Sequence, residues 1–164
     1  MRYHEGPQVI VETEVAARPE VLWALVTDLD LPAQFSDEFQ GADWVDGADG
    51  PALGATFLGR NRHRAIGEWE VRCTVTECDP SRCFGWAVGD PDAPAARWRF
   101  EIEPRSDGSL LRQWAQMGPG PSGLTPMIEQ HPEREEELVE MRLGMWRTNM
   151  DATILGIKAI AEEG

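Results

Sequence analysis

Apolar and polar residues alternate along most of this chain with the period of two that is typical of β-strands. Residues 8–15 begin the pattern, with Val9, Val11, Thr13 and Val15 on one side. Six further runs predict strands at 40–46, 54–63, 67–78, 83–89, 95–103 and 109–117. Because the breaks are short and contain Asp-Gly and Asp-Pro turns, we expect hairpins and an antiparallel sheet of about seven strands.

Two regions follow the helical period instead. Pro19 predicts the start of a helix after the first strand, and residues 32–38 predict a second short helix. Residues 118–131 predict a loop, and Pro132 predicts the start of a long helix to about residue 162. Its main apolar stripe is predicted as Leu138, Met141, Met145, Ala152, Leu155 and Ala159, widened by Val139, Leu143, Trp146, Met150 and Ile157.

Three consecutive strands offer one apolar, aromatic face and one charged face, which predicts a sheet that is covered on one side only. The apolar face comprises Trp69, Val71, Cys73, Val75, Phe84, Trp86, Val88, Trp98, Phe100 and Ile102. The same alternation predicts an inward set of Phe57, Gly59, Asn61 and His63 in one strand and of Leu111, Gln113, Ala115 and Met117 in another. Two amides therefore face inward, and Trp114 faces outward.

Composition indicates a globular protein, and the 164-residue length predicts a single domain over residues 1–164. Fifteen basic and 29 acidic residues give a net charge of −14, which argues against nucleic-acid binding and against an anionic membrane surface. No apolar run approaches the length of a membrane span, and no signal peptide is evident, so we expect a cytoplasmic protein without membrane insertion. The acidic residues of segment 28–50 predict a solvated rim, or a site for a cation or a partner.

Motifs for cofactors and metals are missing from the sequence. There is no dinucleotide or phosphate-binding glycine motif and no zinc motif, so no cofactor and no metal are expected. The three cysteines suit a reducing compartment. Cys78 and Cys83 flank a turn, where they can stay reduced or face each other across a hairpin. No catalytic residue can be assigned from a motif.

The order of strand, short helices, six strands and long helix predicts a bent sheet around that helix. With it, the chain resembles the SRPBCC superfamily of START/Bet v 1-like helix-grip proteins, and within it the polyketide cyclase/dehydrase group. The resemblance is carried by residues 11–15, 18–28, 54–61, 69–78 and 98–104. It implies an α+β fold and a cavity between the sheet and the C-terminal helix for a small hydrophobic or aromatic molecule.

The candidate ligand-binding residues are those predicted to line this cavity: Phe57, Asn61, Trp69, Val71, Trp86, Trp98, Phe100, Gln113, Met141 and Met145. The tryptophans can form a ligand platform or fill the core. Asn61 and Gln113 can orient a ligand carbonyl or hydroxyl, or bond to the backbone or to each other. His63 is either exposed or a base at the cavity mouth. An empty apolar cavity of ~300 Å³ would cost ~7 kcal/mol, so it must be filled, wet or occupied.

Three functions fit these features. The first is binding of a polyketide- or lipid-like molecule without proven catalysis. The second is a polyketide cyclase or aromatase that folds its substrate and removes a proton. The third is a chaperone-assisting or other interaction module, or a homodimer, for which an outward Trp114 and the acidic segment are the motivation.

Overall fold

The computed structural model describes residues 1–164, and its centre is one antiparallel sheet of seven strands. In space the strands follow the order β1-β7-β6-β5-β4-β3-β2, so β1 and β2 are the two edges. Each predicted strand is confirmed, with ends that move by one or two residues. Their bounds are β1 (Gln8–Val15), β2 (Phe39–Val45), β3 (Thr56–His63), β4 (Gly67–Asp79), β5 (Cys83–Val88), β6 (Ala96–Arg105) and β7 (Gly108–Met117).

The helices lie between β1 and β2 and after β7. Helix α1 (Pro19–Val26) begins at Pro19, as predicted, and the expected second helix is the 3-10 turn η2 (Leu31–Gln34). The predicted loop 118–131 contains a short helix, α2 (Thr125–Gln130), which is a correction. The chain also forms the 3-10 turns η1 (Tyr3–Glu5) and η3 (Pro132–Arg134) before the long helix α3 (Glu135–Glu163). None of these helices combines the length and apolar character needed to cross a membrane.

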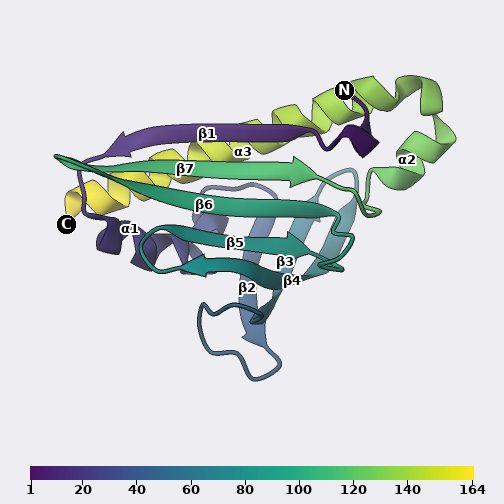
Figure 1. Cartoon of the computed structure of the whole chain (residues 1–164). Helices are drawn as coiled ribbons and strands as arrows, with labels where there is room; N and C mark the ends of the chain where they lie inside the picture. Colours follow the sequence, from purple (N-terminus) through teal and green to yellow (C-terminus); the bar gives the residue numbers. More distant parts are fainter.

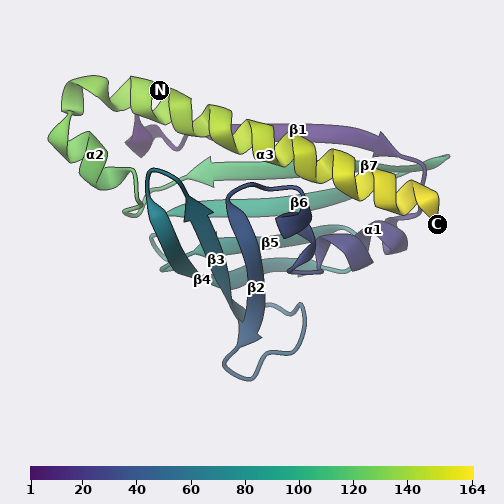
Figure 2. The same cartoon turned by 180° about the vertical axis from the view of Figure 1, so that it is seen from behind.

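The sheet curls around α3, which gives the predicted helix-grip α+β fold (Figures 1 and 2). Helix α3 runs alongside β1, while β2, β3 and β4 bend away from that direction and lie below the helix at a steep angle to it (Figure 2). Helix α1 packs near the C-terminal end of α3. The concave face of the sheet and the inner side of α3 therefore enclose the core.

The predicted register of β7 is confirmed, since Leu111, Gln113, Ala115 and Met117 are all buried. A bulge between Val75 and Glu77 in β4 changes which side chains face inward near its end. Cys78 then pairs with Phe84 of β5, and Asp79 pairs with Cys83. Successive residues of a strand point to opposite faces, so Cys78 and Cys83 lie on opposite faces and both are free thiols.

Helix α3 buries a different face from the predicted stripe. Met141 and Leu155 are 51% and 55% exposed, and Ala152 and Ala159 are also on the solvent side. Two faces of α3 are rich in apolar residues. The face with the larger apolar side chains is the buried one, because its burial removes more apolar area from water. That core face comprises Leu138, Val139, Trp146, Met150, Thr153, Ile154, Ile157 and Ala161.

Side chains of α3 cover the free edge of β1. The Lys158 ammonium donates to the Glu14 carbonyl at 2.7 Å and to the Glu162 carboxylate at 2.7 Å. That carboxylate also accepts from the Ala16 amide at 2.9 Å, and this contact is the main cause of its lowered pKa. Unpaired backbone groups at the edge of a sheet can pair with strands of other chains. Here the side chains of Lys158 and Glu162 form hydrogen bonds with backbone groups at this edge.

The segment between η2 and β2 is fixed to the other side of α3 at two points. The Phe35 ring lies directly on Gly156, where a Cβ atom would collide with the ring. Further along, Arg142 donates two hydrogen bonds to the Glu38 carboxylate, at 2.7 and 2.9 Å. We call residues 35–38 the strap. The strap and β1 together hold α3 from both sides.

Candidate functional site

Aromatic rings cover the concave face of the sheet. Phe57 contacts Trp44 and Trp86 edge-on, with ring centroids 5.6 and 5.9 Å apart. Trp86 also lies 5.5 Å from Phe84 and 6.1 Å from Phe100. These separations are typical of favourable aromatic pairs. The rings therefore form one continuous apolar wall across β3, β5 and β6.

Helix α3 adds a ring to this wall through Trp146, which sequence reasoning placed only at the margin of the stripe. Its ring centroid lies 4.8 Å from that of Trp98, the shortest separation among the aromatic pairs. Trp98 and Trp86 are half-buried, whereas Phe100 and Phe57 are buried. The predicted residues Phe57, Trp86, Trp98 and Phe100 thus come together beneath α3.

Gln113 lies in the middle of this apolar surface. It pairs with Phe100 of β6 and with Val11 of β1. Leu111 and Ala115 lie two residues before and after it in β7, on the same face. The residue is 6% exposed, and its Oε1 atom has no hydrogen-bond partner. The two other buried polar side chains, Ser109 and Thr153, donate to the Ala17 and Asn149 carbonyls.

An unpaired buried acceptor is rare and costs about 1–3 kcal/mol. On the concave face, the four neighbours of Gln113 in and across its strand are apolar, so none of these side chains can donate to it. Asn61 does not do so either, because β4, β5 and β6 separate β3 from β7. The alternative in which the two amides bond to each other is therefore wrong.

A groove of about 740 Å³ opens between α3 and the hairpin that joins β3 to β4. Met145 is the one apolar residue that lines it. Asn61 of β3 pairs with Trp69 of β4 close to the hairpin turn. Asn61 and Trp69 are half-buried, and Val71 packs against the core farther from the turn. Met141 does not belong to this wall: it faces solvent, which corrects the prediction. The remaining lining residues are Asp37, Glu38, Arg62, His63, Arg64, Gly67, Glu68, Thr148 and Asn149.

The groove is more polar than the sequence suggested. His63 lines it, and its Nδ1 accepts the Ala65 amide hydrogen at 3.1 Å. The Nε2 nitrogen remains for a ligand. Arg60 pairs with Asp43, but Arg62 and Arg64 form no ion pair. The Glu38–Arg142 pair borders the groove, and no local sequence signal connects two residues this far apart.

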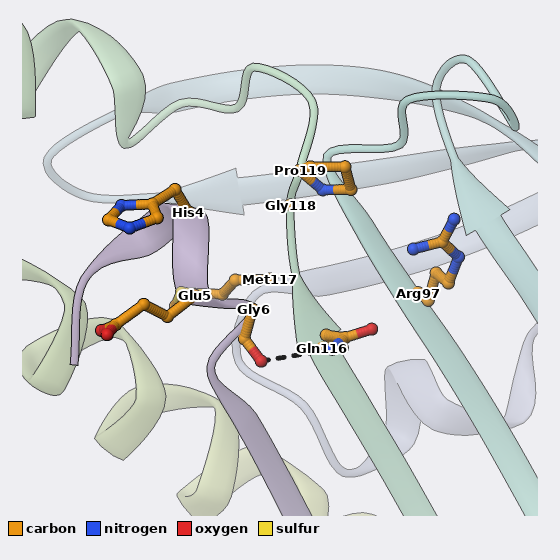
Figure 3. Close-up of a pocket in the computed structure, with 8 residues that line it drawn as sticks. All are labelled: His4, Glu5, Gly6, Arg97, Gln116, Met117, Gly118 and Pro119. Carbon is orange, nitrogen blue, oxygen red and sulfur yellow. Dashed lines mark hydrogen bonds between the residues drawn. The ribbon is translucent and has the colours of Figure 1, made fainter.

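A smaller hollow of about 240 Å³ lies on the outer face, at the ends of β1, β6 and β7. Figure 3 shows His4 and Glu5 from η1 on one side of it and Arg97 on the other. The Gln116 amide donates to the Gly6 carbonyl at 3.2 Å and closes the base (Figure 3). Arg97 and Gln116 point away from the aromatic wall, so this hollow is separate from the groove.

The outward position of Trp114 is confirmed, but its ring is not a bare apolar surface. The Arg99 guanidinium lies 4.3 Å from the ring centroid, and the indole N–H donates to Gln8 Oε1 at 2.8 Å. A cation stacked on the ring and a satisfied N–H are typical of a packed outer face. Trp114 therefore adds no support to the interaction-module hypothesis.

Burial also removes the cysteine thiols from the candidate chemistry. It raises the pKa of Cys73, on the concave face, from 9.0 to about 12. On the outer face, burial and the hydrogen bond to Glu77 raise the pKa of Cys83 to about 12. Both remain neutral thiols at physiological pH, and the thiolate is the nucleophile.

The bent sheet and the long helix that it surrounds define a helix-grip α+β protein. The chain belongs to the family described as polyketide cyclase / dehydrase and lipid transport, whose model matches residues 7–144. A comparison with curated proteins found no match.

Solved structures agree with this assignment. The Polyketide_cyc-like protein Cgl2372 from Corynebacterium glutamicum is 28% identical, with a TM-score of 0.68 over 94% of this chain and 91% of that one. The di-domain ARO/CYC protein BexL from the BE-7585A biosynthetic pathway is 14% identical, with a TM-score of 0.71. This chain is covered over 96% and spans 50% of BexL. Major latex-like protein 151 from Panax ginseng is 10% identical, with a TM-score of 0.63 over 95% of this chain and 97% of that one. The last two likenesses concern the fold.

Proposed function

We propose that this protein binds a small, flat, hydroxylated aromatic molecule between the aromatic wall and α3. The observation that carries the proposal is the Gln113 amide, which is buried among apolar side chains with an unpaired Oε1. A ligand hydroxyl supplies the donor that this oxygen lacks. The half-buried rings of Trp86 and Trp98 supply a surface for stacking.

The groove beside Met145 supports an entry route for such a ligand. Its volume lies within the range of roughly 300–1,000 Å³ that is usual for small-molecule sites. The description of the family, polyketide cyclase / dehydrase and lipid transport, agrees with the proposed ligand class. The ligand of this chain is accordingly a polyketide-like aromatic compound.

A titration of tryptophan fluorescence with a phenolic polycyclic compound and its methyl ether tests the proposal. The phenol donates to Gln113 and the ether cannot, so the phenol binds more tightly to the wild type. In Gln113→Leu this preference disappears, and the affinity for the phenol falls by about 10- to 100-fold, as expected for one buried hydrogen bond. The matched control is Gln116→Leu, on the same strand but the outer face. Equal affinities of wild type and Gln113→Leu for the phenol would refute the assignment.

A second candidate, cyclisation of a polyketide chain, is favoured by His63 in the groove. The aromatic wall would hold the chain in a folded form, and the imidazole would move a proton at the mouth. The interior of the protein offers less support for cyclisation, because its only buried polar side chains, those of Ser109, Gln113 and Thr153, include no acid or base. Product analysis with a poly-β-carbonyl substrate tests it: binding without turnover, or turnover that persists in His63→Gln, would contradict this assignment.

A further inference from the structure

The outer face of α3 carries a second apolar stripe that nothing in the fold covers. It includes Met141, Met145, Thr148, Ala152, Leu155 and Ala159. Met145 is half-buried and the other five are exposed. No element lies over this side of the helix in Figure 2. We call it the outer stripe.

The spacing within the outer stripe is that of a coiled coil. Its members follow one another at steps of four, three, four, three and four residues, the pattern of alternating a and d positions. No charged residue occupies these positions, although 27% of the chain is charged. A solvated helix face is normally charged. The spacing therefore indicates a helix as the partner.

The outer stripe is complementary to itself when a second copy runs antiparallel. With the midpoint at residue 150, Met141 lies opposite Ala159 of the partner copy, and Thr148 lies opposite Ala152. Met145 in turn meets Leu155. Two of the three layers thus join a larger side chain to a smaller one, which lets the helices approach closely.

Charges on one flank of the outer stripe agree with the same arrangement. Arg147 and Asp151 lie at equal distances from residue 149. In an antiparallel pair, the same flanks of the two helices meet, so each basic residue faces an acidic residue of the other copy. Because the charged pair is centred one residue from the apolar midpoint, its two members are offset by two residues along the axis, about 3 Å, which these side chains can span.

We propose that two copies of this chain associate through their α3 helices in an antiparallel pair centred near residue 150. The stripe spans about 27 Å of helix and about 10 Å of width, so it buries about 300 Å² per copy. Stable interfaces bury about 800 Å² per partner, so this dimer forms weakly and depends on concentration. Because Met145 and Thr148 also line the groove, dimerisation narrows the entrance.

Sedimentation velocity of the purified protein, from low micromolar to near-millimolar concentration, tests the proposal. The wild type shows a monomer–dimer equilibrium. Leu155→Glu places a charge in two layers of the dimer and weakens it by about tenfold for each copy. Leu155 is already exposed in the monomer, so the variant folds. The matched control is Leu53→Glu, because Leu53 is 72% exposed and lies far from α3 in the loop before β3. This control keeps the wild-type equilibrium.

A charge exchange tests the antiparallel register. Arg147→Asp alone weakens the dimer, and combining it with Asp151→Arg restores it. A monomer at every concentration, or a dimer that Leu155→Glu leaves intact, would overturn the proposal. A dimer that the double exchange fails to restore would overturn the register. At protein concentrations where the chain is monomeric, the phenol titration in Gln113→Leu is independent of these results, since Gln113 lies on the opposite side of α3 from the outer stripe.

Discussion

Replacement of Gln113 by leucine should separate stability from binding. In the protein without ligand, the buried Oε1 accepts no hydrogen bond, so folding removes the amide from water without compensation. That penalty is about 1–3 kcal/mol. Leucine has nearly the same size and no polar atom, and its neighbours Val11, Phe100, Leu111 and Ala115 are apolar. We therefore expect Gln113→Leu to be more stable than the wild type by about 1 kcal/mol or more.

Urea unfolding followed by tryptophan fluorescence measures this gain. With a slope of about 2 kcal/mol per molar urea, a gain of 1 kcal/mol moves the midpoint upward by about 0.5 M. The control Gln116→Leu removes a hydrogen bond to the Gly6 carbonyl and should not stabilise the protein. A phenol concentration that saturates the wild type should then raise the midpoint of the wild type by more than that of Gln113→Leu, because the variant binds the phenol more weakly.

One result would refute the reasoning directly. If Gln113→Leu is less stable than the wild type by 1 kcal/mol or more, the amide contributes to folding as a satisfied group. The role of a ligand as its missing partner would then be lost.

Three further predictions concern the grip on α3 and the buried thiol. Gly156→Ala should destabilise the protein by about 1–3 kcal/mol, because the added methyl group collides with the Phe35 ring of the strap. Gly144→Ala, in open space on the same helix, should stabilise it by up to about 1 kcal/mol. Equal effects of the two substitutions in thermal unfolding would contradict the contact between Phe35 and Gly156. Glu38 and its partner Arg142 are 15% and 18% exposed, so Glu38→Gln leaves the Arg142 guanidinium largely buried without a counter-charge. We expect this substitution to lower the free energy of unfolding by about 2–3 kcal/mol, measured by urea unfolding. The exposed Glu137→Gln is its control and should change little. The thiol of Cys73 has a pKa of about 12 in the folded protein against 9.0 ordinarily, so above pH 9 the unfolded state holds fewer protons. Stability should be fully present below pH 9 and fall between pH 9 and 12; Cys73→Val should flatten that fall, and an unchanged slope would argue against burial as the cause.

The sheet could be predicted from the sequence because alternation fixes which side chains share a face. The burial of Leu111, Gln113, Ala115 and Met117 follows from that period alone. Alternation fails where a strand gains a residue. The bulge between Val75 and Glu77 turns Cys78 inward, and neither residue type nor spacing announces it.

The buried face of α3 could not be predicted for a different reason. Both Leu155 and Ile154 lie on apolar faces with helical spacing, and periodicity gives them equal weight. The choice depends on how much bulk the concave sheet can accommodate. The strap was also beyond prediction, because Glu38 and Arg142 are brought together only when the chain closes around the helix.

The pairing of β1 with β7 has a consequence for the protein during its synthesis. Val11 pairs with Gln113, about 100 residues later in the chain, so β1 emerges long before its partner. At about 5–20 residues per second, the wait is about 5–20 s. Contacts this distant in sequence also form slowly. During that interval the first strand lacks both its β7 partner and its lysine cover, so its backbone groups are open to pairing with other chains.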